Sequence, residues 1–595
     1  MPSTTVTLAA VGNKATYNEV TATTAQQTLI INAGVTVKKL TVKGGNLKIY
    51  GKVEQLVHDA GDTTIYIIKG TEASLPATID SKFVVQSDVA VLKTAFANGE
   101  DFKLSADADI TGQSVSVPAG KSVVLDLNGY TLTADNSATG KIIVLGKMTL
   151  KDSSTEKKGK IVASQDYTAA SYNGSLIEIA GEDASMTMES GNISAVRETP
   201  DSNGQYGVGV TDGGDFTMTG GKIEAGWFAV AGNGNYKTQN SIINITDGEL
   251  ISTADYAVYL PQSGTTTISG GKVYGAAGGV CIQRGTLNVE GTALITSKGT
   301  GSTGNWGDGT GGLDCAAINV SGAYGIATVN IKGGTLIAEA KSLITEGTTY
   351  TPVINVTGGT FSDPSVLKYM ATNATVDIKL LSNINIAKTE LATGYILNAA
   401  NATANLNLNG HDIINSSETA DATPFTQIFT VQNGTLNISG NGNVKCDASA
   451  TAKDDGYRMV IEARGYGTVN IHGGSYYNTQ KLNTQIDLIY ARENGKINIY
   501  GGTFESGKYG TPNNDTDGRY WVLNLKNTDK NTASIQVSGG TFINFNPANP
   551  NMDDNESYLV TGYEVTRDGS VYTAAHKVGD GRKEYIVGQT SQENR

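Results

Sequence analysis

Acidic residues are the first candidates for chemistry in this chain, because glycoside hydrolysis uses two carboxyl groups that flank the scissile bond. Asn527-Thr528-Asp529 and Asp553-Asp554 come nearest to the acidic pattern of a pectin hydrolase. That pattern continues with Gly-His-Gly and a basic Arg-Ile-Lys, and neither motif follows here. Both acidic groups also fall in segments that we expect to be solvated loops. We therefore predict no catalytic residues and no enzymatic activity.

The histidines offer little general-base chemistry. His472 occupies a repeat position that is Thr, Ser, Lys or Tyr in other copies, and His411 replaces Tyr130 of a similar segment. Positions that accept so many residue types are typical of an ordinary surface. His58 and His576 have no recognisable partners, and the sequence has no Ser–His–Asp order or metal-spaced histidine pair.

Calcium is the one cofactor that the sequence suggests. Asn513, Asp515 and Asp517 alternate before Gly518, as ligands do at the start of a calcium-binding loop. Position twelve of that loop is Asn524, where a bidentate glutamate is expected. A solvated loop is the simpler interpretation, and otherwise we predict no cofactor.

Aromatic residues are better candidates for ligand binding. Trp306 lies in the glycine-rich segment TGSTGNWGDGTGG, which has few side chains that could bury it. Trp227 follows the corner of a repeat copy, and Tyr520-Trp521 follow the acidic segment. Exposed aromatic rings beside amides and carboxylates stack on sugars and bond their hydroxyls. We predict glycan binding at Trp306, Trp227, Tyr520 and Trp521, with packing between coils as the alternative for Trp227 and Trp521.

A repeated phrase determines the elements that position these residues: alternating apolar and polar residues, then Gly-Gly, then a further apolar residue. Copies include FTMTGGKI ending at Ile223, VNIHGGSY ending at Tyr476 and IQVSGGTF ending at Phe542. In VNIH, the period of two places Val469 and Ile471 on one face, as in a strand with one buried face. The next apolar residue follows after an odd step, so the glycines must turn a corner to return it to the same interior.

The repeat predicts an all-β, right-handed parallel β-helix. The corner glycines are Gly220, Gly221, Gly270, Gly271, Gly333, Gly334, Gly358, Gly359, Gly473, Gly474, Gly501, Gly502, Gly539 and Gly540. Copies recur at intervals of roughly 20–30 residues, which suits coils of two or three short strands. Asparagine often stands between the two apolar residues, as Asn470 and Asn498 do, and we expect these amides to stack from coil to coil.

Composition excludes several classes of partner. The net charge of −13 argues against nucleic-acid binding, which needs a basic surface. No stretch is long and apolar enough to span a membrane, so we expect no membrane insertion. Cys281, Cys315 and Cys446 form neither a disulfide framework nor a zinc pattern and are expected to be buried. The segment MPSTTVTLAAVGNK lacks secretory-signal features, so either a signal has been removed or the protein leaves its cell by another route.

The chain contains a tandem duplication. Val91-Leu92-Lys93 and Leu127-Asn128-Gly129 recur in the same order as Val366-Leu367-Lys368 and Leu408-Asn409-Gly410. The predicted parts are an N-terminal β unit for assembly over 1–79, a first β-helix over 80–362, a second over 363–560, and a C-terminal hairpin cap and tail over 561–595.

Each β-helical body is expected to open with a short helix that caps the exposed end of the solenoid. Ser87 is the predicted N-cap of the first helix, which Gly99 ends. Asp363 is the predicted N-cap of the second, with Pro364 at its first position. A hairpin that turns at Asp568-Gly569 is expected to close the last coil.

Two further segments carry a family resemblance. VLKTAFANGEDFKLSADADITG with VVLDLNGYTL, and GGTFINFNPANPNMDDNESYLVTGYEV near the end, resemble β-helical appendage proteins of tailed phages of gut Bacteroidales. These include fibres of crAss-like phages, and related modules occur in surface proteins of the host bacteria. The resemblance covers about residues 83–575. It implies a homo-oligomeric rod, dimeric or trimeric, whose N-terminal part anchors it to other virion proteins, and it implies no catalytic residues.

The sequence thus predicts a non-enzymatic virion fibre or decoration protein, on the head or the tail, that displays a rigid β-helix and binds host-surface glycans. One alternative is an adhesin on the bacterial cell surface. The other is a tailspike that degrades polysaccharide.

Overall fold

The chain forms a parallel β-solenoid, as the repeat predicts. The computed structural model describes residues 4–577 apart from 10–14, 24–26, 71–72, 136–139, 165–173, 197–204, 233–238, 302–313, 347–348, 387–393, 416–424, 447–456, 479–485, 507–519 and 551–555. The chain divides into two compact units, Met1–Ile354 and Asn355–Arg595. Strand β36 (Val353–Val356) contains this boundary, which lies shortly before the predicted one at residue 363.

The first unit begins with a small two-sheet solenoid. One sheet has the order β1 (Thr4–Leu8), β3 (Gln27–Ile31), β5 (Asn46–Ile49), β7 (Ile65–Lys69), β8 (Phe83–Ser87), and the other β2 (Ala15–Ala22), β4 (Val35–Val42), β6 (Lys52–His58). Neighbouring strands are parallel, and equivalent residues of successive coils pair, as Leu29 does with Leu47. Val37, Ile49 and Ile67 lie in its closed apolar core. The N-terminal β unit therefore follows the same building principle as the bodies after it.

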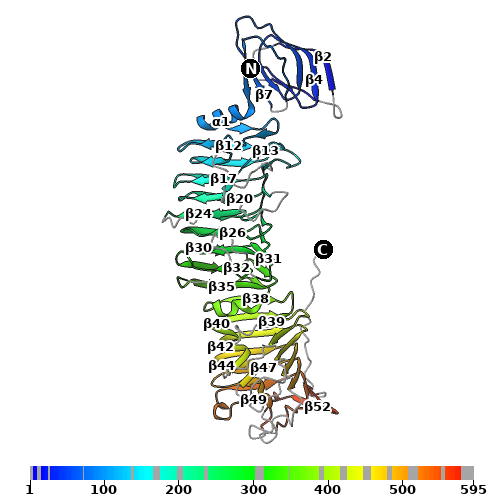
Figure 1. The fold of residues 1–595 in the computed structure, drawn as a ribbon. Coiled ribbons are helices and arrows are strands. Elements are labelled where there is room, and N and C mark those ends of the chain that lie inside the picture. Colours follow the sequence, from blue (N-terminus) through cyan, green and yellow to red (C-terminus); the bar gives the residue numbers. More distant parts are fainter. Residues whose placement is uncertain are drawn as a thin grey trace. The chain divides into compact units, whose positions relative to one another are not determined.

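Three parallel sheets then form the first β-helix, and Figure 1 shows its coils following one another from β12 to β35. The first sheet contains β9 (Phe102–Lys103), β12 (Ser122–Asp126), β15 (Lys147–Lys151), β18 (Ser185–Met188), β21 (Asp215–Met218), β24 (Ser241–Ile245), β27 (Gly264–Ile268), β30 (Gly285–Val289) and β33 (Ala327–Ile331). The second contains β10 (Ala108–Asp109), β13 (Thr131–Ala134), β16 (Lys160–Ala163), β19 (Asn192–Ala195), β22 (Lys222–Ala225), β25 (Glu249–Ser252), β28 (Lys272–Gly275), β31 (Leu294–Ser297) and β34 (Thr335–Ala338). The third contains β11 (Val115–Val117), β14 (Ile142–Val144), β17 (Gly174–Ala180), β20 (Gln205–Thr211), β23 (Val230–Gly232), β26 (Tyr256–Leu260), β29 (Gly278–Ile282), β32 (Ala316–Val320) and β35 (Lys341–Thr345).

Burial differs between these sheets. In the first two, fully buried residues alternate with half-buried ones, as in β18 and β19. In the third sheet, every residue of β26, β29 and β32 is buried. The first two sheets therefore present an outer face to solvent, and this part of the third does not.

Helices stand at both predicted positions. Helix α1 (Asp88–Asn98) follows β8 directly and buries Leu92 and Phe96. The second is a 3-10 helix, η1 (Pro364–Tyr369), where Asp363 Oδ1 accepts a hydrogen bond from Ser365 N at 2.8 Å. The predicted N-cap at Asp363 is therefore confirmed.

The second unit has two sheets. One contains β37 (Thr360–Phe361), β38 (Thr375–Lys379), β40 (Tyr395–Asn407), β42 (Phe425–Ser439), β44 (Tyr457–Ile471), β46 (Ile486–Ala491), β47 (Lys496–Ile499), β49 (Tyr520–Leu525) and β50 (Ser534–Val537). The other contains β39 (Ile384–Ile386), β41 (Ile413–Asn415), β43 (Asn443–Cys446), β45 (Ser475–Asn478), β48 (Thr503–Ser506), β51 (Thr541–Ile543), β53 (Val571–His576) and β52 (Tyr563–Asp568). A short 3-10 helix, η2 (Asn527–Asp529), precedes β50. Strands β52 and β53 form the predicted antiparallel hairpin, and β53 pairs with β51.

The two glycines of a corner are needed for different reasons. Gly540 has φ +101°, in the left-handed region that other residues avoid. A Cβ on Gly539 would instead lie 2.2 Å from the carbonyl oxygen of Tyr500 in the preceding coil. The second glycine of the other predicted pairs also has positive φ: Gly221, Gly271, Gly334, Gly359, Gly474 and Gly502. One glycine turns the chain, and the other lets the coils approach.

Aromatic side chains stack inside the second unit just after these corners. The rings of Tyr476 and Phe504 lie 5.0 Å apart at 8°, and those of Phe504 and Phe542 lie 5.0 Å apart at 14°. All three are fully buried, and Tyr476 donates a hydrogen bond to Gly473 O at 2.8 Å. The apolar residue after each glycine pair therefore returns to the interior, as the phase of the repeat predicts.

Candidate functional site

A ladder of amides runs along the outer side of the second unit. From β38 to β47, Asn405 donates to Asp377, Asn437 to Asn405, Asn470 to Asn437 and Asn498 to Asn470, each Nδ2–Oδ1 distance being 2.8–2.9 Å. We call Asp377, Asn405, Asn437, Asn470 and Asn498 the amide ladder. Asn405, Asn437 and Asn470 each use one donor and one acceptor in this ladder, and Asn498 ends it as a donor. This is the stacking that the sequence predicts for these positions.

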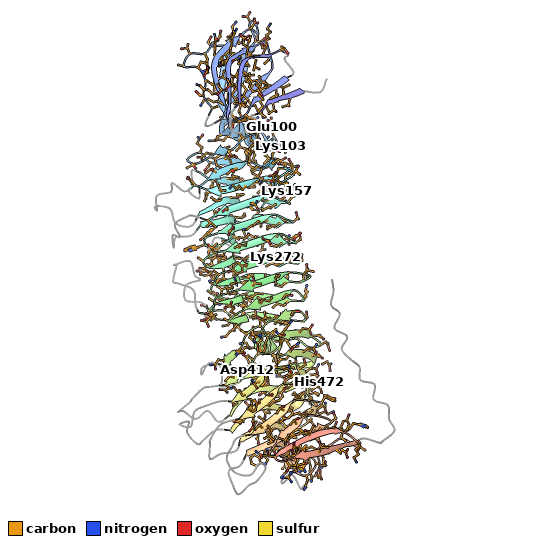
Figure 2. All side chains as sticks on the ribbon, turned by 90° about the vertical axis from the view of Figure 1, so that its right-hand side faces the viewer. Glu100, Lys103, Lys157, Lys272, Asp412 and His472 are labelled. Carbon is orange, nitrogen blue, oxygen red and sulfur yellow. The ribbon has the colours of Figure 1, made fainter. Side chains whose placement is uncertain are left out.

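Two exposed rings stack beside the amide ladder. His472 directly follows β44 and Tyr500 directly follows β47, each two residues beyond a ladder asparagine. Their ring centroids lie 4.7 Å apart at 9° (Figure 2 labels His472). Tyr500 is 50% exposed. Ser439 and Ser538 occupy the same position in the flanking coils, because His472 N donates to Ile438 O and Ser538 N donates to Ile499 O. Among the described residues, the flanking coils therefore carry only a serine at the position where a further ring could stack on the pair.

The predicted aromatic residues do not form an exposed surface. Trp227 is only 3% exposed because it packs against Tyr206 of the preceding coil, with ring centroids 6.2 Å apart. Trp521 is 5% exposed and pairs in register with Asp487. Glycan stacking on these two tryptophans is therefore wrong, and the alternative of packing between coils holds. Trp306 lies outside the described residues, and Tyr520 is described only as the first backbone position of β49.

No metal centre is found in the described part of the chain. Asn513, Asp515 and Asp517 lie outside the described residues. Asn524, at position twelve of the predicted calcium loop, donates its Nδ2 to Asp487 Oδ1 at 2.9 Å. Among the residues that are described, no group of three or more His, Cys, Asp or Glu side chains could hold a metal ion.

Asp529 is the described acid of the two acidic groups, and its carboxylate accepts a backbone hydrogen bond. Its Oδ2 accepts a hydrogen bond from Glu493 N at 2.7 Å, and this bond lowers the pKa of Asp529. Lys526 Nζ lies 3.3 Å from the same oxygen. Asp553 and Asp554 lie outside the described residues.

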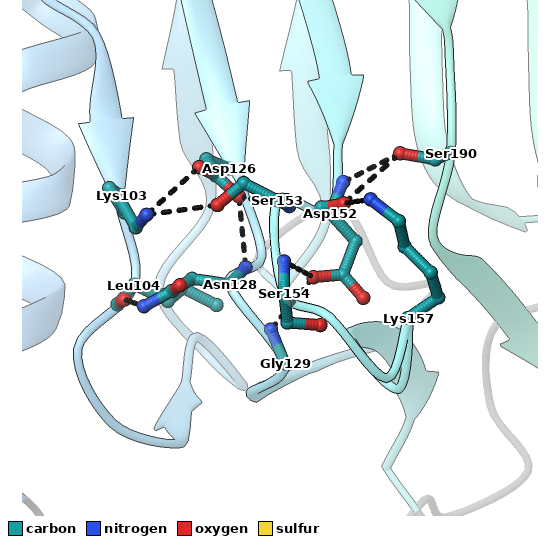
Figure 3. Close-up of polar contacts among 10 residues, drawn as sticks. All are labelled: Lys103, Leu104, Asp126, Asn128, Gly129, Asp152, Ser153, Ser154, Lys157 and Ser190. Atoms are coloured by element: carbon teal, nitrogen blue, oxygen red, sulfur yellow. Dashed lines mark hydrogen bonds and ion pairs between the residues drawn. The ribbon is translucent and has the colours of Figure 1, made fainter.

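Buried aspartates in the first β-helix also bind backbone N–H groups (Figure 3). Asp126 Oδ1 accepts from Asn128 N at 3.0 Å and from Ser153 N at 2.9 Å, which joins two coils. Asp152 accepts from Gly129 N at 2.8 Å and from Gly159 N at 2.6 Å. Burial alone would raise the pKa of each carboxyl, but these hydrogen bonds outweigh it and hold both pKa values below the usual range. Both carboxylates therefore have a structural role as acceptors for backbone N–H groups.

The same turn recurs in the second unit, where Asn407 replaces Asp126. Asn407 Oδ1 accepts from Asn409 N at 2.9 Å, and Asn409 Nδ2 donates to Leu380 O at 2.8 Å. In the first unit, Asn128 Nδ2 donates to Leu104 O at 3.0 Å. The duplication seen in the sequence therefore extends to single hydrogen bonds.

A buried charged pair in the second unit has no local signal in the sequence. Glu462 is 2% exposed and accepts a hydrogen bond from Arg492 Nε at 2.6 Å. Burial alone would lower the pKa of Arg492, but the bond to Glu462 and its charge raise it. Tyr490 pairs in register with Glu462, and burial raises its pKa to about 12. The two partners are a whole coil apart in sequence, so only the coil register could have indicated the pair.

A second unexpected group joins the N-terminal solenoid to the first β-helix. Tyr50 hydrogen-bonds Ser105, and Lys48 Nζ lies 3.4 Å from Ser105 Oγ. Asp88, the first residue of α1, is 8% exposed, and within the described structure its Oδ1 has no hydrogen-bond partner. Burial raises the pKa of Asp88 to about 6, although the charge of Lys48 acts against this.

The raised pKa of Asp88 predicts that this residue makes the folded protein less stable as pH rises, the opposite of a carboxyl group whose pKa is lowered by folding. The folded protein holds a proton on Asp88 up to about pH 6, whereas the unfolded chain loses it at about pH 4. The contribution of Asp88 to stability is therefore lost as pH rises through this window. We expect Asp88→Asn to match the wild type at pH 4 and to be more stable by about 2 kcal/mol above pH 6.

Urea unfolding of both proteins across pH 4–8 measures this difference. Asp62→Asn is the matched control, because the Asp62 side chain is fully exposed in the same solenoid. A stability difference for Asp88→Asn that does not change with pH would contradict the assignment.

Comparisons with known proteins identify no relative. No family model, no curated protein and no solved structure matches this chain. None of the described helices has the length and hydropathy of a membrane span.

Proposed function

We propose that this protein is a non-enzymatic virion appendage that attaches to host-surface glycans through the second unit. The proposal includes a right-handed coil, with α1 and η1 capping the solenoid ends. It also includes a homo-oligomeric fibre in which the N-terminal solenoid binds other virion proteins.

The carrying observation is the exposed His472–Tyr500 pair beside the amide ladder. Coils repeat about every 4.8 Å, close to the stacking distance of a sugar on an aromatic ring. A pyranose placed over Ser538 would therefore lie against the free face of Tyr500. Gln536 follows Asn498 in register and is exposed, so its amide is available to the sugar hydroxyls.

A repetitive surface of this kind suits attachment better than catalysis. Asp529, the described acid of the two acidic groups, is held by a backbone hydrogen bond. Single sugar contacts are weak. Several copies of one fibre convert weak contacts into avidity, because later contacts form at a high effective concentration. A virion supplies such copies.

The test is binding of the purified chain to host capsular polysaccharide by surface plasmon resonance. Tyr500→Ala is expected to weaken binding about tenfold, which corresponds to one lost aromatic contact. Tyr66→Ala is the matched control, because Tyr66 is 51% exposed and lies in the first unit. Equal binding by both variants would overturn the site.

Capsule degradation tests the non-enzymatic part. Wild-type protein is expected to release no reducing ends or unsaturated sugars from capsule that it binds. Release that disappears in Asp529→Asn, Asp553→Asn or Asp554→Asn, with binding retained, would instead identify a depolymerase.

A further inference from the structure

A cavity of about 450 Å³ lies between the N-terminal solenoid and the first coils of the β-helix, within the first unit. Asn32, Tyr50 and Gly70 line one side, at equivalent positions that follow β3, β5 and β7. Residues Ser105–Asp109 and Tyr130 line the other. The volume is within the range of small-ligand pockets.

The walls of this junction cavity combine carboxylates with tyrosines. Asp107 Oδ1 accepts from Thr131 N at 2.7 Å, and Asp109 Oδ1 accepts from Thr111 N at 2.8 Å. Within the described structure, nothing bonds the second oxygen of either carboxylate, and both side chains are exposed. Asp107 directly precedes β10 and Asp109 ends it, and both are exposed whereas Ala108 between them is buried, so both acids lie on the outer side of the chain here.

The remaining polar groups of the cavity are uncharged. Asn32 and Thr133 add an amide and a hydroxyl, and the ring of Tyr130 adds an aromatic surface. Among the described residues that line the cavity, none is basic. Carboxylate oxygens accept hydrogen bonds from vicinal hydroxyls, whereas an acidic ligand would be repelled.

We propose that the junction cavity binds one saccharide unit that carries no acidic group. Asp107 and Asp109 accept hydrogen bonds from its hydroxyls, Asn32 supplies a donor, and Tyr130 packs against its ring. This site is independent of the His472–Tyr500 pair, because it lies in the other unit and uses other residues.

The test is saturation-transfer NMR with the full-length chain carrying Tyr500→Ala, which removes the ring proposed for the other site. The probes are galactose, glucose, N-acetylglucosamine and glucuronate. At least one neutral sugar is expected to bind with a Kd on the order of 1 mM. Glucuronate is expected to bind at least about tenfold more weakly.

Two variants test whether the saturation-transfer signal comes from the junction cavity. Asp107→Asn with Asp109→Asn keeps an acceptor for each backbone N–H and is expected to weaken binding at least about tenfold. Ala33→Trp, at an exposed position of the cavity wall, is expected to abolish it. Asp183→Asn, at an exposed turn of the β-helix, is the control and is expected to bind as the parent does.

Three results would overturn the proposal: no signal from any neutral sugar, a signal that survives Ala33→Trp, or tighter binding of ethylammonium than of every sugar. The last would identify the cavity as a cation site. Loss of capsule binding by Tyr500→Ala has no bearing on this experiment, so the two sites can fail separately.

Discussion

Replacing Arg492 with methionine is expected to destabilise the second unit by about 3–5 kcal/mol. The substitution keeps much of the side-chain volume but leaves Glu462, which is 2% exposed, as a buried charge without its 2.6 Å donor. Removing one partner of a buried pair is costly because the remaining charge has lost its hydration without compensation. Urea unfolding followed by circular dichroism measures the loss.

A second substitution separates the buried charge from lost packing. Arg492→Met combined with Glu462→Leu removes both charges and is expected to recover most of the stability. Lys39→Met is the matched control, because its pair with Glu19 is 3.1 Å long but exposed, and its loss costs at most about 1 kcal/mol. A double variant as unstable as Arg492→Met would show that the loss comes from packing.

Replacing Phe504 with alanine is expected to cost a similar amount, about 3–5 kcal/mol. The ring is fully buried between Tyr476 and Phe542, at 5.0 Å from each, so its removal leaves a cavity and interrupts the stack. Thermal unfolding and urea unfolding both report this change.

The control for Phe504→Ala comes from the same coil. Tyr500 lies four residues earlier but is 50% exposed, and Tyr500→Ala is expected to change stability by less than about 1 kcal/mol. Tyr476→Phe removes only the hydrogen bond to Gly473 O and is expected to cost about 1 kcal/mol. Equal losses for Phe504→Ala and Tyr500→Ala would mean that the stack does not stabilise the core.

The sequence predicts the coils well because their causes are local. The odd step after each Gly-Gly requires a corner, and Gly540 has the positive φ that the corner needs. The repeated Leu-Asn-Gly indicates a duplication, and Asn128 and Asn409 make equivalent hydrogen bonds. The N-terminal solenoid was harder to recognise because it carries one repeat copy, ending at Leu47.

The candidate site was less predictable because its contacts join different coils. The position of Trp227 after a corner predicts an exposed ring, but Tyr206 of the preceding coil packs against it. The variation at the repeat position of His472 predicts an ordinary surface residue. Tyr500 occupies the same repeat position one coil later. The two rings stack because the coil register brings these positions side by side.

The amide ladder has a mechanical consequence for the second unit. Hydrogen bonds between parallel coils point along the coil axis, so a tensile load on that axis acts on the backbone ladder and on the side-chain bonds from Asp377 to Asn498 together. Separating one coil from the next must break the backbone hydrogen bonds and the ladder bond between those two coils together. Each ruptured coil of about 30 residues then releases roughly 100 Å of chain. The unit is therefore expected to unfold coil by coil under load and to absorb mechanical work, which would protect the proposed attachment at Tyr500.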